Sequence, residues 1–398
     1  MAKVRLLIAE DSTFQRNMLS KMLSEHEKIE ICGLARNGKE AIEKVAEHNP
    51  DVLLLDLIMP EMDGLTAFKF LSKHYPVPTI IFTGMDPATL DSSVQALLLG
   101  AVDYIVKPKG IWKEEFPKYK DKLIDKIIIA SNIKKSSTKR RELLTTSIEN
   151  YLKEFPPEKP VPAKKAEKVI PKKIPKVKPK VKPKKIPKVK PKEIPKVKPR
   201  EIGIEFKRFK PKVIVIGTST GGPRVLRTVL KDIPRTFPIP ILIVQHLEEQ
   251  FMRTFANSLN NLCEIKVKIA QNKERILPNK VYLAPGANHM EVYGINKEPH
   301  LRIFKGDPVN FCRPSVDVLF FSAAKIYKNA LLGILLTGLG NDGAAGLKAI
   351  KTNGGLTIAE SEETCVIYGM PKAAIKIDAA RLVLPIYQVR SHILKYAK

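Results

Sequence analysis

The feature that most constrains this chain is a tract of low complexity near its middle, over residues 156–201. Proline recurs at every fourth position from Pro171 to Pro199, and most of the intervening residues are Lys, Val or Ile. Proline lacks a backbone N–H and disrupts helices, and like charges repel, so the tract is predicted to be an extended spacer without a core. The chain should therefore divide into a domain at 1–130, a linker at 131–211 and a second domain at 212–398.

This spacer carries much of the positive charge. The 398 residues have a formal net charge of +28, and residues 156–201 hold 18 Lys and Arg against 4 Asp and Glu, a net of +14. Half of the total charge therefore comes from the spacer. A charged linker is favoured over a segment that binds RNA, DNA or an anionic membrane, because no aromatic residues are interleaved for base stacking. We expect no specific nucleic-acid partner.

The rest of the composition indicates an ordinary globular protein. No apolar run approaches the length of a membrane span, and no signal peptide opens the chain. The four cysteines lie far apart and form no C-x-x-C pair; they are Cys32, Cys263, Cys312 and Cys365. We therefore expect a reduced, cytoplasmic protein without a membrane span or structural zinc.

The N-terminal domain alternates strand and helix patterns five times. Its strands are expected at Val4–Ala9, Ile29–Ala35, Val52–Leu55, Thr79–Phe82 and Val102–Val106. Its helices are expected at Phe14–Leu23, Gly38–Glu47, Leu65–Lys73, Pro87–Leu99 and Ile111–Ile133. Five strand–helix units of this length predict an α/β domain with a doubly wound, flavodoxin-like parallel sheet.

Polar side chains follow the carboxyl ends of these strands, where open α/β sheets place their sites. Glu10 and Asp11 follow the first strand, and Asp56 ends the third. Three clustered carboxylates suit Mg²⁺, which prefers oxygen ligands. Thr83 and Lys107 follow the fourth and fifth strands and can bind the oxygens of a phosphoryl group. Asp56 is then predicted to be the nucleophile that forms an aspartyl phosphate.

The C-terminal domain is predicted to be a second doubly wound, mostly parallel α/β domain. Strands are expected at Val213–Ile216, Ile241–Gln245, Glu264–Ile269, Lys280–Leu283, Leu331–Leu336 and Leu356–Ala359. Helices are expected at Arg224–Leu230, Met252–Asn260, Val316–Tyr327 and Gly343–Asn353. The alternation of the two element types favours a parallel sheet with helices on its faces.

The first of these strands leads into Gly217-Thr-Ser-Thr-Gly-Gly-Pro223. The paired glycines allow a close bend, and the proline suits the first turn of a helix. Ser219 is therefore expected at a strand-to-helix turn, where free N–H groups and the helix dipole favour the negative charge of an acyl intermediate. A glycine-rich turn more often binds a phosphate or dinucleotide, although this one is neither a G-x-G-x-x-G nor a P-loop sequence. The residues predicted to lie near Ser219 are therefore needed to decide between a nucleophile and a phosphate-binding turn.

Two other residues are expected beside Ser219 at the same edge of the sheet. His246 follows one apolar strand, and Asp342 lies in the glycine-rich loop after another. A serine needs a base to become nucleophilic, and a histidine base needs a carboxylate that fixes its tautomer. Two alternatives stay open. Asp342 could instead cap the helix that follows it, and His289, near the site loops, could orient or bind a substrate.

Motifs in both domains resemble a known family. The N-terminal motifs resemble the receiver domain of response regulators; they are Ala9–Ser12, Leu55–Gly64, Thr83–Gly84 and Lys107–Pro108. The C-terminal motifs are Gly217–Pro223, Gln245–His246, Leu283–Gly286, Arg313–Leu319, Leu336–Gly343 and Tyr368–Pro371. In this order the two sets resemble the chemotaxis protein-glutamate methylesterase, in which a receiver controls a serine esterase.

The resemblance implies an enzyme, a phosphorylation-activated hydrolase of glutamate methyl esters on chemoreceptors, which resets chemotaxis signalling during adaptation. It also implies deamidation of receptor glutamines. Ser219 would be the nucleophile, His246 the base and Asp342 the residue that orients it. A chemotaxis histidine kinase would phosphorylate Asp56, with Mg²⁺ at the receiver and no cofactor at the esterase site. The unphosphorylated receiver would cover the cleft.

The chain departs from the usual pattern of this family only near the substrate rim, at Thr218, Leu247, Phe311–Cys312 and Leu339. We expect contacts with the substrate or the oxyanion from Thr220, Gly338, Leu339 and Arg313. Two rival functions remain. The second domain could be a docking module that has lost catalysis, or the chain could be a nucleic-acid-binding regulator, although no helix-turn-helix pattern supports the latter.

Overall fold

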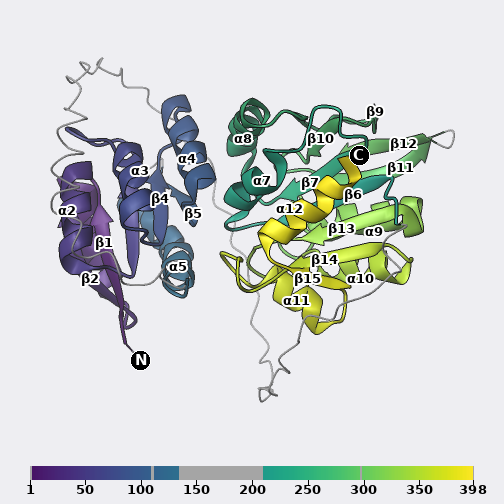
Figure 1. Ribbon diagram of the computed structural model, residues 1–398. Coiled ribbons are helices and arrows are strands. Elements are labelled where there is room, and N and C mark those ends of the chain that lie inside the picture. Colours follow the sequence, from purple (N-terminus) through teal and green to yellow (C-terminus); the bar gives the residue numbers. More distant parts are fainter. Residues whose placement is uncertain (1, 109–111, 134–208, 296–297, 398) are drawn as a thin grey trace, which may run out of the picture.

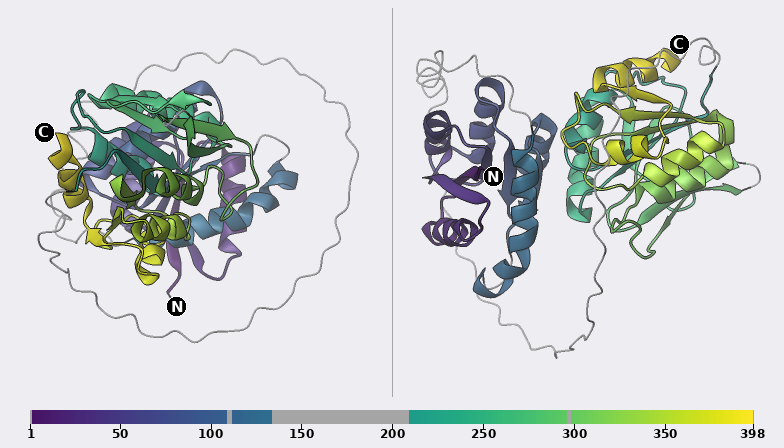
Figure 2. Two further views of the ribbon diagram at one scale, coloured as in Figure 1. Left: turned by 90° about the vertical axis from the view of Figure 1, so that its right-hand side faces the viewer. Right: turned by 90° about the horizontal axis from the view of Figure 1, so that it is seen from below.

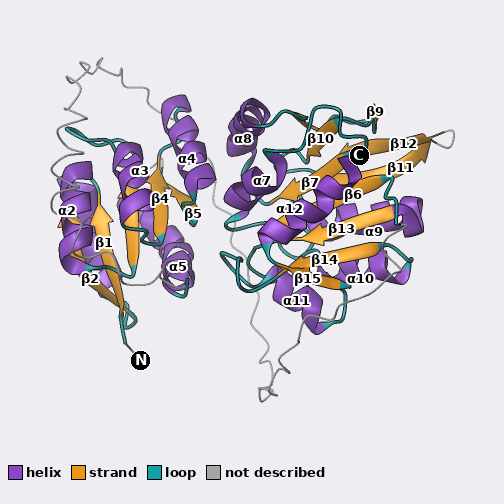
Figure 3. Ribbon diagram, in the orientation of Figure 1, coloured by secondary structure: helices purple, strands orange, loops and turns teal. Residues whose placement is uncertain are grey.

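The computed structural model describes residues 2–108, 112–133, 209–295 and 298–397, which form two α/β domains (Figure 1). The predicted proline-rich spacer lies outside the described residues. In both domains the strands form a central layer with helices on both faces (Figure 3). None of the helices in the described ranges combines the length and the apolar composition that a membrane crossing requires.

The N-terminal domain is a five-stranded parallel sheet in the order β2-β1-β3-β4-β5. The strands are β1 (Val4–Ala9), β2 (Ile29–Ala35), β3 (Val52–Asp56), β4 (Thr79–Thr83) and β5 (Asp103–Val106). The helices are α1 (Thr13–Ser24), α2 (Gly38–His48), α3 (Gly64–His74), α4 (Pro87–Leu99) and α5 (Trp112–Ser131). This arrangement confirms the predicted flavodoxin-like fold, and β3 and β4 are buried throughout because helices cover both faces.

Short polar side chains define where the first four helices begin. Ser12, Asn37, Asp63 and Asp86 precede α1 to α4, and each accepts a hydrogen bond from the backbone N–H three residues later. These bonds satisfy donors that have no partner inside the helix. Each of these helices therefore starts at its capping residue, in the loop that follows a strand.

The C-terminal domain has a seven-stranded parallel sheet in the order β15-β14-β13-β6-β7-β10-β8. Its strands are β6 (Val213–Thr218), β7 (Ile241–Gln245), β8 (Lys266–Ile269), β10 (Lys280–Leu283), β13 (Leu331–Leu335), β14 (Leu356–Glu360) and β15 (Leu382–Leu384). Its helices are α7 (Gly222–Leu230), α8 (Glu249–Leu262), α9 (Val316–Tyr327), α10 (Ala344–Thr352), α11 (Met370–Lys376) and α12 (Ile386–Leu394). The chain runs from β6 outward to β7, and later returns to the other side of β6 with β13, so β6 is the point at which the strand order reverses.

A small antiparallel sheet that the sequence did not predict joins this domain. It consists of β11 (His289–Ile295), β12 (Glu298–Phe304) and β9 (Glu274–Arg275), with β12 in the centre. One face packs on the domain core through residues such as Leu301, while neighbours such as Arg302 are exposed. The polar residues of this half-exposed hairpin conceal the apolar signal that the buried parallel strands carry.

The two domains share an interface. Helix α4 contacts α7 and α8 (Figures 1 and 2), and apolar residues of both domains belong to one buried cluster. The rings of Tyr104 on β5 and Phe251 on α8 lie 4.1 Å apart. The Glu248 N–H donates to the Tyr104 hydroxyl at 3.3 Å, and Arg227 donates to the Leu98 carbonyl at 3.2 Å. The N-terminal domain thus lies against the helices that follow β6 and β7.

Candidate active site

Ser219 occupies the turn between β6 and α7. Its N–H donates to the Thr337 carbonyl at 3.0 Å, which ties the turn to the end of β13. Its carbonyl accepts from the Gly222 N–H at 2.8 Å. Gly221 has φ of +79°, and a side chain there would also collide with Val366, so the bend requires glycine.

The same turn presents backbone donors. Within the described residues, the N–H groups of Thr220 and Gly221 have no hydrogen-bond acceptor, and they lie just before the first turn of α7. Free N–H groups at a helix N-terminus attract negative charge. This turn can therefore stabilise an oxyanion that forms near Ser219.

His246 lies beside Ser219 because β6 and β7 are parallel neighbours. Thr218 pairs with Gln245, and the His246 N–H donates to the Thr218 carbonyl at 3.1 Å. The Gln245 amide donates to the carbonyls of Ser219 and His246 at 2.9 and 3.0 Å. One side chain thus holds both strand ends at a fixed separation.

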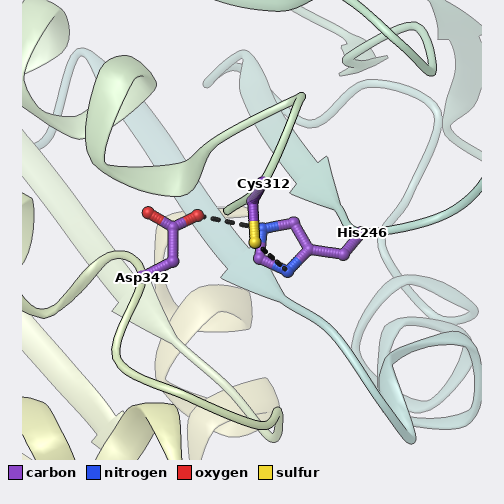
Figure 4. A group of neighbouring side chains, drawn as sticks. All are labelled: His246, Cys312 and Asp342. Atoms are coloured by element: carbon purple, nitrogen blue, oxygen red, sulfur yellow. Dashed lines mark hydrogen bonds and ion pairs between the residues drawn. The ribbon is translucent and has the colours of Figure 1, made fainter. Parts of the chain in front are cut away.

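Asp342 holds the imidazole of His246, with 2.9 Å between its Oδ2 and Nε2 (Figure 4). Its Oδ1 accepts from Ser315 Oγ at 2.8 Å and from Asn310 Nδ2 at 2.9 Å. The Val316 N–H donates to Oδ2 at 2.7 Å. Asp342 was alternatively expected to cap the following helix α10. Its carboxylate instead accepts from an N–H at the start of α9, a helix that lies earlier in the chain.

The burial and the bonding set the charges of this pair. Burial raises the pKa of Asp342, but the hydrogen bonds from His246 and Asn310 lower it by more, so the pKa lies below the ordinary value. Burial lowers the pKa of His246, but the hydrogen bonds to Asp342 and Cys312 raise it by more, to about 9. Asp342 is therefore ionised, and it stabilises a proton on His246.

A cysteine lies close to the ring of His246. Cys312 Sγ is 3.7 Å from Nδ1 and within 4.8 Å of a carboxylate oxygen of Asp342, and in Figure 4 the sulfur overlaps the imidazole. Among the described residues, Ser219 Oγ has no hydrogen bond to Nδ1. These three side chains include zinc-ligand types. Asp342 bonds to Nε2 and Cys312 is nearest Nδ1, so the ring could offer a single metal ion only one of these two nitrogens. Cys312 was not among the residues predicted to act at this site, although Phe311–Cys312 departs from the usual pattern of the family.

His289, which could have bound a substrate, is instead part of the packing below the site. It is buried, its Nδ1 accepts from the Ser315 N–H at 3.2 Å, and its Nε2 is 2.9 Å from the Asp307 carbonyl. Both ring nitrogens are therefore used by backbone groups. His289 fixes the loop before α9, which carries Cys312.

A cavity of about 620 Å³ lies in front of Ser219 and His246. Thr220, Cys312 and Arg313 line it, in part with residues of the N-terminal domain. The Gly338 N–H donates to the Ile367 carbonyl at 3.0 Å, so this amide is occupied here. Leu339 is 53% exposed in the same loop as Gly338.

The N-terminal domain reaches this cavity. The Thr220 hydroxyl donates to Asp103 Oδ2 at 3.2 Å, and the same carboxylate is 2.7 Å from Lys126 Nζ. Lys122 Nζ lies 3.7 Å from Glu248 Oε1, and both residues line the cavity. These contacts place β5 and α5 over the residue next to Ser219, so the cavity is partly covered in this state.

The predicted acidic residues of the N-terminal domain also lie together. Carboxylate oxygens of Glu10, Asp11 and Asp56 are all within 4.8 Å of one another. Lys107 Nζ is 2.9 Å from Glu10 and 2.7 Å from Asp56. Burial and the charge of Asp56 raise the pKa of Glu10 to about 7, and burial also raises the pKa of Asp56. One lysine therefore does not balance the buried negative charge, and oxygen ligands of this kind suit Mg²⁺.

Thr83 lies at the end of the neighbouring strand β4. It is buried, and its hydroxyl accepts from Ser93 Oγ of α4 at 2.8 Å. This bond connects the carboxyl edge of the sheet to the helix that contacts α7 and α8. A change at Thr83 can therefore reach the domain interface through α4.

The comparisons with known proteins match both domains. Residues 6–113 match the family described as response regulator receiver domain, and residues 214–393 match the family described as CheB methylesterase. These two segments contain the acidic cluster and the Ser219–His246–Asp342 group, respectively.

Curated relatives match over nearly their whole length. A protein-glutamate methylesterase/protein-glutamine glutaminase of Halalkalibacterium halodurans is 35% identical over 94% of this chain and 93% of its own. A protein of the same name from Archaeoglobus fulgidus is 33% identical over 99% and 98%. The solved catalytic domain of Thermotoga maritima CheB methylesterase is 40% identical over 47% of this chain and 98% of that chain, with a TM-score of 0.46.

Proposed function

The chain belongs to the protein-glutamate methylesterase/protein-glutamine glutaminase family, and on this basis we propose that it hydrolyses glutamate methyl esters on chemoreceptors. It also deamidates receptor glutamines, since both substrates are carbonyl derivatives of the same side chain. The observation that carries the proposal is the bond of 2.9 Å between His246 and Asp342 beside the Ser219 turn. The activity of the enzyme resets receptor signalling during adaptation.

In the first step Ser219 Oγ attacks the ester carbonyl. His246 takes the serine proton on Nδ1, because Asp342 keeps the other nitrogen protonated. The carbonyl oxygen becomes an oxyanion, and the free N–H groups of Thr220 and Gly221 donate to it. When the intermediate collapses, His246 returns its proton to the departing methoxide, and methanol leaves.

In the second step water replaces methanol. His246 takes a proton from this water, which attacks the acyl carbon and releases a free glutamate. Ser219 then recovers its proton from His246. A glutamine follows the same steps, with ammonia as the leaving group.

Four free cysteines agree with a reducing compartment, and we place the protein in the cytoplasm.

The receiver domain controls access to the cavity. A histidine kinase of the chemotaxis system would donate a phosphoryl group to Asp56, and Thr83 and Lys107 would bind its oxygens. If Thr83 turns toward this group, it gives up its bond to Ser93 and shifts α4 against α7 and α8. The phosphate then favours the arrangement in which the receiver leaves the cavity, as a shift of population.

Mg²⁺ fits the receiver site. Glu10, Asp11 and Asp56 would hold the ion, because their carboxylates are clustered and Lys107 compensates only part of their charge. When it is bound, the ion neutralises the charge of the phosphoryl group during its transfer. The chain itself positions Asp56 and supplies Lys107.

The proposal is tested by methanol release from methylated receptor membranes, with and without Mg²⁺ and a small acyl phosphate. Release that rises with the phosphodonor supports the hydrolase and its control by the receiver. Methanol release that does not change with the phosphodonor would reject control by the receiver domain but not the hydrolase activity. No release in either condition supports the rival function, a module that only docks on receptors.

Replacing Asp56 by Asn should remove the activation. The amide cannot form the acyl phosphate, so the ratio of methanol release with and without phosphodonor should fall to about one. Asp91→Asn is the matched control, because Asp91 is exposed on α4 and, among the residues that the structure describes, its carboxylate bonds only to Gln95. A ratio that stays at the wild-type value in Asp56→Asn would move the phosphorylation site elsewhere.

The pH dependence of methanol release should reveal the raised pKa of His246. Only its neutral form accepts the Ser219 proton, and its pKa is raised to about 9. Methanol release per enzyme should therefore rise roughly tenfold per pH unit below 9 and become level above it, after subtraction of spontaneous hydrolysis. Cys312→Ala removes one bond that holds the proton, so its profile should move to lower pH. A wild-type profile that is already level above pH 6.5 would contradict this charge state.

A further inference from the structure

The loop before α9 carries an aromatic side chain that the fold does not use. Phe311 is 103% exposed, the largest fraction among the exposed apolar residues that the structure describes. It lines the cavity in front of Ser219 and His246. Receiver residues such as Asp103 line the same cavity, yet no described residue covers the Phe311 ring. The ring therefore neither fills the core nor holds the receiver in place.

The backbone places Phe311 in an unusual conformation. The N–H and the carbonyl of Val309 bond to the carbonyl and the N–H of Cys312, at 3.1 and 2.9 Å, and so close a two-residue turn. The residues of the turn, Asn310 and Phe311, have φ of +52° and +63°. Turns with positive φ at both positions favour asparagine followed by glycine. Asn310 fits this pattern and Phe311 does not, because a bulky side chain is strained at positive φ.

Asn310 anchors this turn to the catalytic group. Its side-chain amide donates to Asp342 at 2.9 Å and to Asp317 at 2.7 Å. Asp342 in turn holds the imidazole of His246. The backbone that carries the Phe311 ring is therefore fixed relative to the catalytic base. An aromatic residue on a fixed turn loses little conformational entropy when it binds a partner.

Two physical costs meet at Phe311. Its backbone conformation favours glycine, and its ring exposes apolar surface to water. Strained residues cluster at functional sites, and exposed apolar surface beside a cavity is typical of binding sites. Pro308 and Val309 are exposed as well, so three of the four residues at the loop tip, residues 308–311, are apolar. These properties together indicate a contact with a partner that enters the cavity.

We propose that Phe311 determines specificity for the receptor, by packing on an apolar side chain of the receptor segment that carries the glutamate methyl ester. The proposal rests on the proposed function, which defines this substrate. The ester must enter the cavity to reach Ser219, so the receptor chain on either side of it lies across the cavity mouth, where Phe311 is exposed. A methyl ester alone offers little area for binding. A ring that becomes buried against the receptor adds affinity for the segment as a whole.

The first experiment compares a large and a small ester at saturating phosphodonor. The large one is a lipid-free, methylated cytoplasmic fragment of a receptor, and the small one is the γ-methyl ester of N-acetylglutamate. The ratio of their kcat/KM values, fragment over small ester, should fall by about tenfold or more in full-length Phe311→Gly, because an aromatic anchor is lost. Phe311→Leu keeps an apolar side chain and should retain most of the wild-type ratio.

Two outcomes of this experiment would overturn the proposal. One is an unchanged ratio in Phe311→Gly, which includes the case in which activity falls only on receptor membranes and the ring binds lipid. The other is an equal ratio in Phe311→Leu and Phe311→Gly. Phe321→Ala is the matched control, because Phe321 is a 48% exposed phenylalanine on α9 that does not line the cavity. It should keep the wild-type ratio.

Thermal unfolding separates a docking role from a structural one. Glycine adopts positive φ without strain, so Phe311→Gly should unfold at the wild-type temperature or above it, while its activity on the receptor fragment falls. Phe311→Leu keeps the strained backbone and should gain no stability. An unfolding temperature of Phe311→Gly below that of wild type would assign the ring to the fold and contradict the proposal.

The last experiment does not depend on ester hydrolysis. Binding of the unmethylated receptor fragment is measured by fluorescence anisotropy with phosphodonor present. The Kd should rise by about tenfold or more in Phe311→Gly, for the same loss of apolar contact. If wild type hydrolyses neither ester but the Kd rises as expected, the hydrolase function fails and the docking contact stands. An unchanged Kd in a protein that hydrolyses the fragment contradicts the docking contact alone.

Discussion

Replacing Ser219 by Ala should lower methanol release by roughly ten-thousandfold or more, because loss of the nucleophile in serine hydrolases removes most of the rate enhancement. Only the hydroxyl is removed. The backbone bonds of the turn, from Ser219 N–H to Thr337 and from Gly222 N–H to Ser219, stay available. The fold and the free N–H groups should therefore be unchanged. Methanol release at saturating phosphodonor measures the effect without a contribution from receiver control.

Two controls separate the loss of chemistry from a loss of structure. Ser391→Ala changes an exposed serine on α12 whose hydroxyl, in the described part of the chain, bonds only to the Tyr387 carbonyl of the same helix, so it should behave as wild type. Phosphorylation of Asp56 in Ser219→Ala should proceed at the wild-type rate. Methanol release within about tenfold of wild type would assign the nucleophile to another residue.

Replacing Asp342 by Asn should lower methanol release by roughly a thousandfold to ten-thousandfold. Oδ1 accepts from three donors, Asn310, Ser315 and the Asp317 N–H, so the asparagine carbonyl should take that position. Its NH₂ group then takes the position of Oδ2, and the bond from the Val316 N–H is lost as well. A donor then faces Nε2 of His246, which must become the acceptor. The ring proton moves to Nδ1, the nitrogen that has to accept the Ser219 proton, and a wrong tautomer of this kind has a cost of this size in serine proteases.

Asp317→Asn is the matched control for this change. Asp317 is also buried and bonds to Asn310, but it does not contact His246. Its replacement should lower the unfolding temperature while keeping methanol release within about tenfold of wild type. If Asp342→Asn and Asp317→Asn lose activity equally, Asp342 acts through the packing of the loop before α9 and not through the tautomer of His246.

The strand ends of the candidate sites could be predicted because they depend on local sequence. A buried apolar run that stops at a polar residue marks the carboxyl edge of a parallel sheet, and this rule places Asp56, Thr83, Ser219 and His246. The helices of the receiver begin after short polar residues that cap them, so their starts were also readable. The antiparallel hairpin was missed, since its exposed face replaces a continuous apolar run with polar residues.

The sequence by itself determined the two α/β domains, the family and the edge of each sheet at which polar side chains gather. These features depend on the spacing of apolar residues and on turn residues, which determine the structure of segments only a few residues long. Only the tertiary structure decided that Asp342 caps α9 while it holds His246, that Cys312 approaches the other nitrogen, and that Asp103 touches Thr220. These contacts join residues that are between 26 and 117 positions apart. Their geometry follows from how loops pack on a completed sheet, which no local pattern encodes.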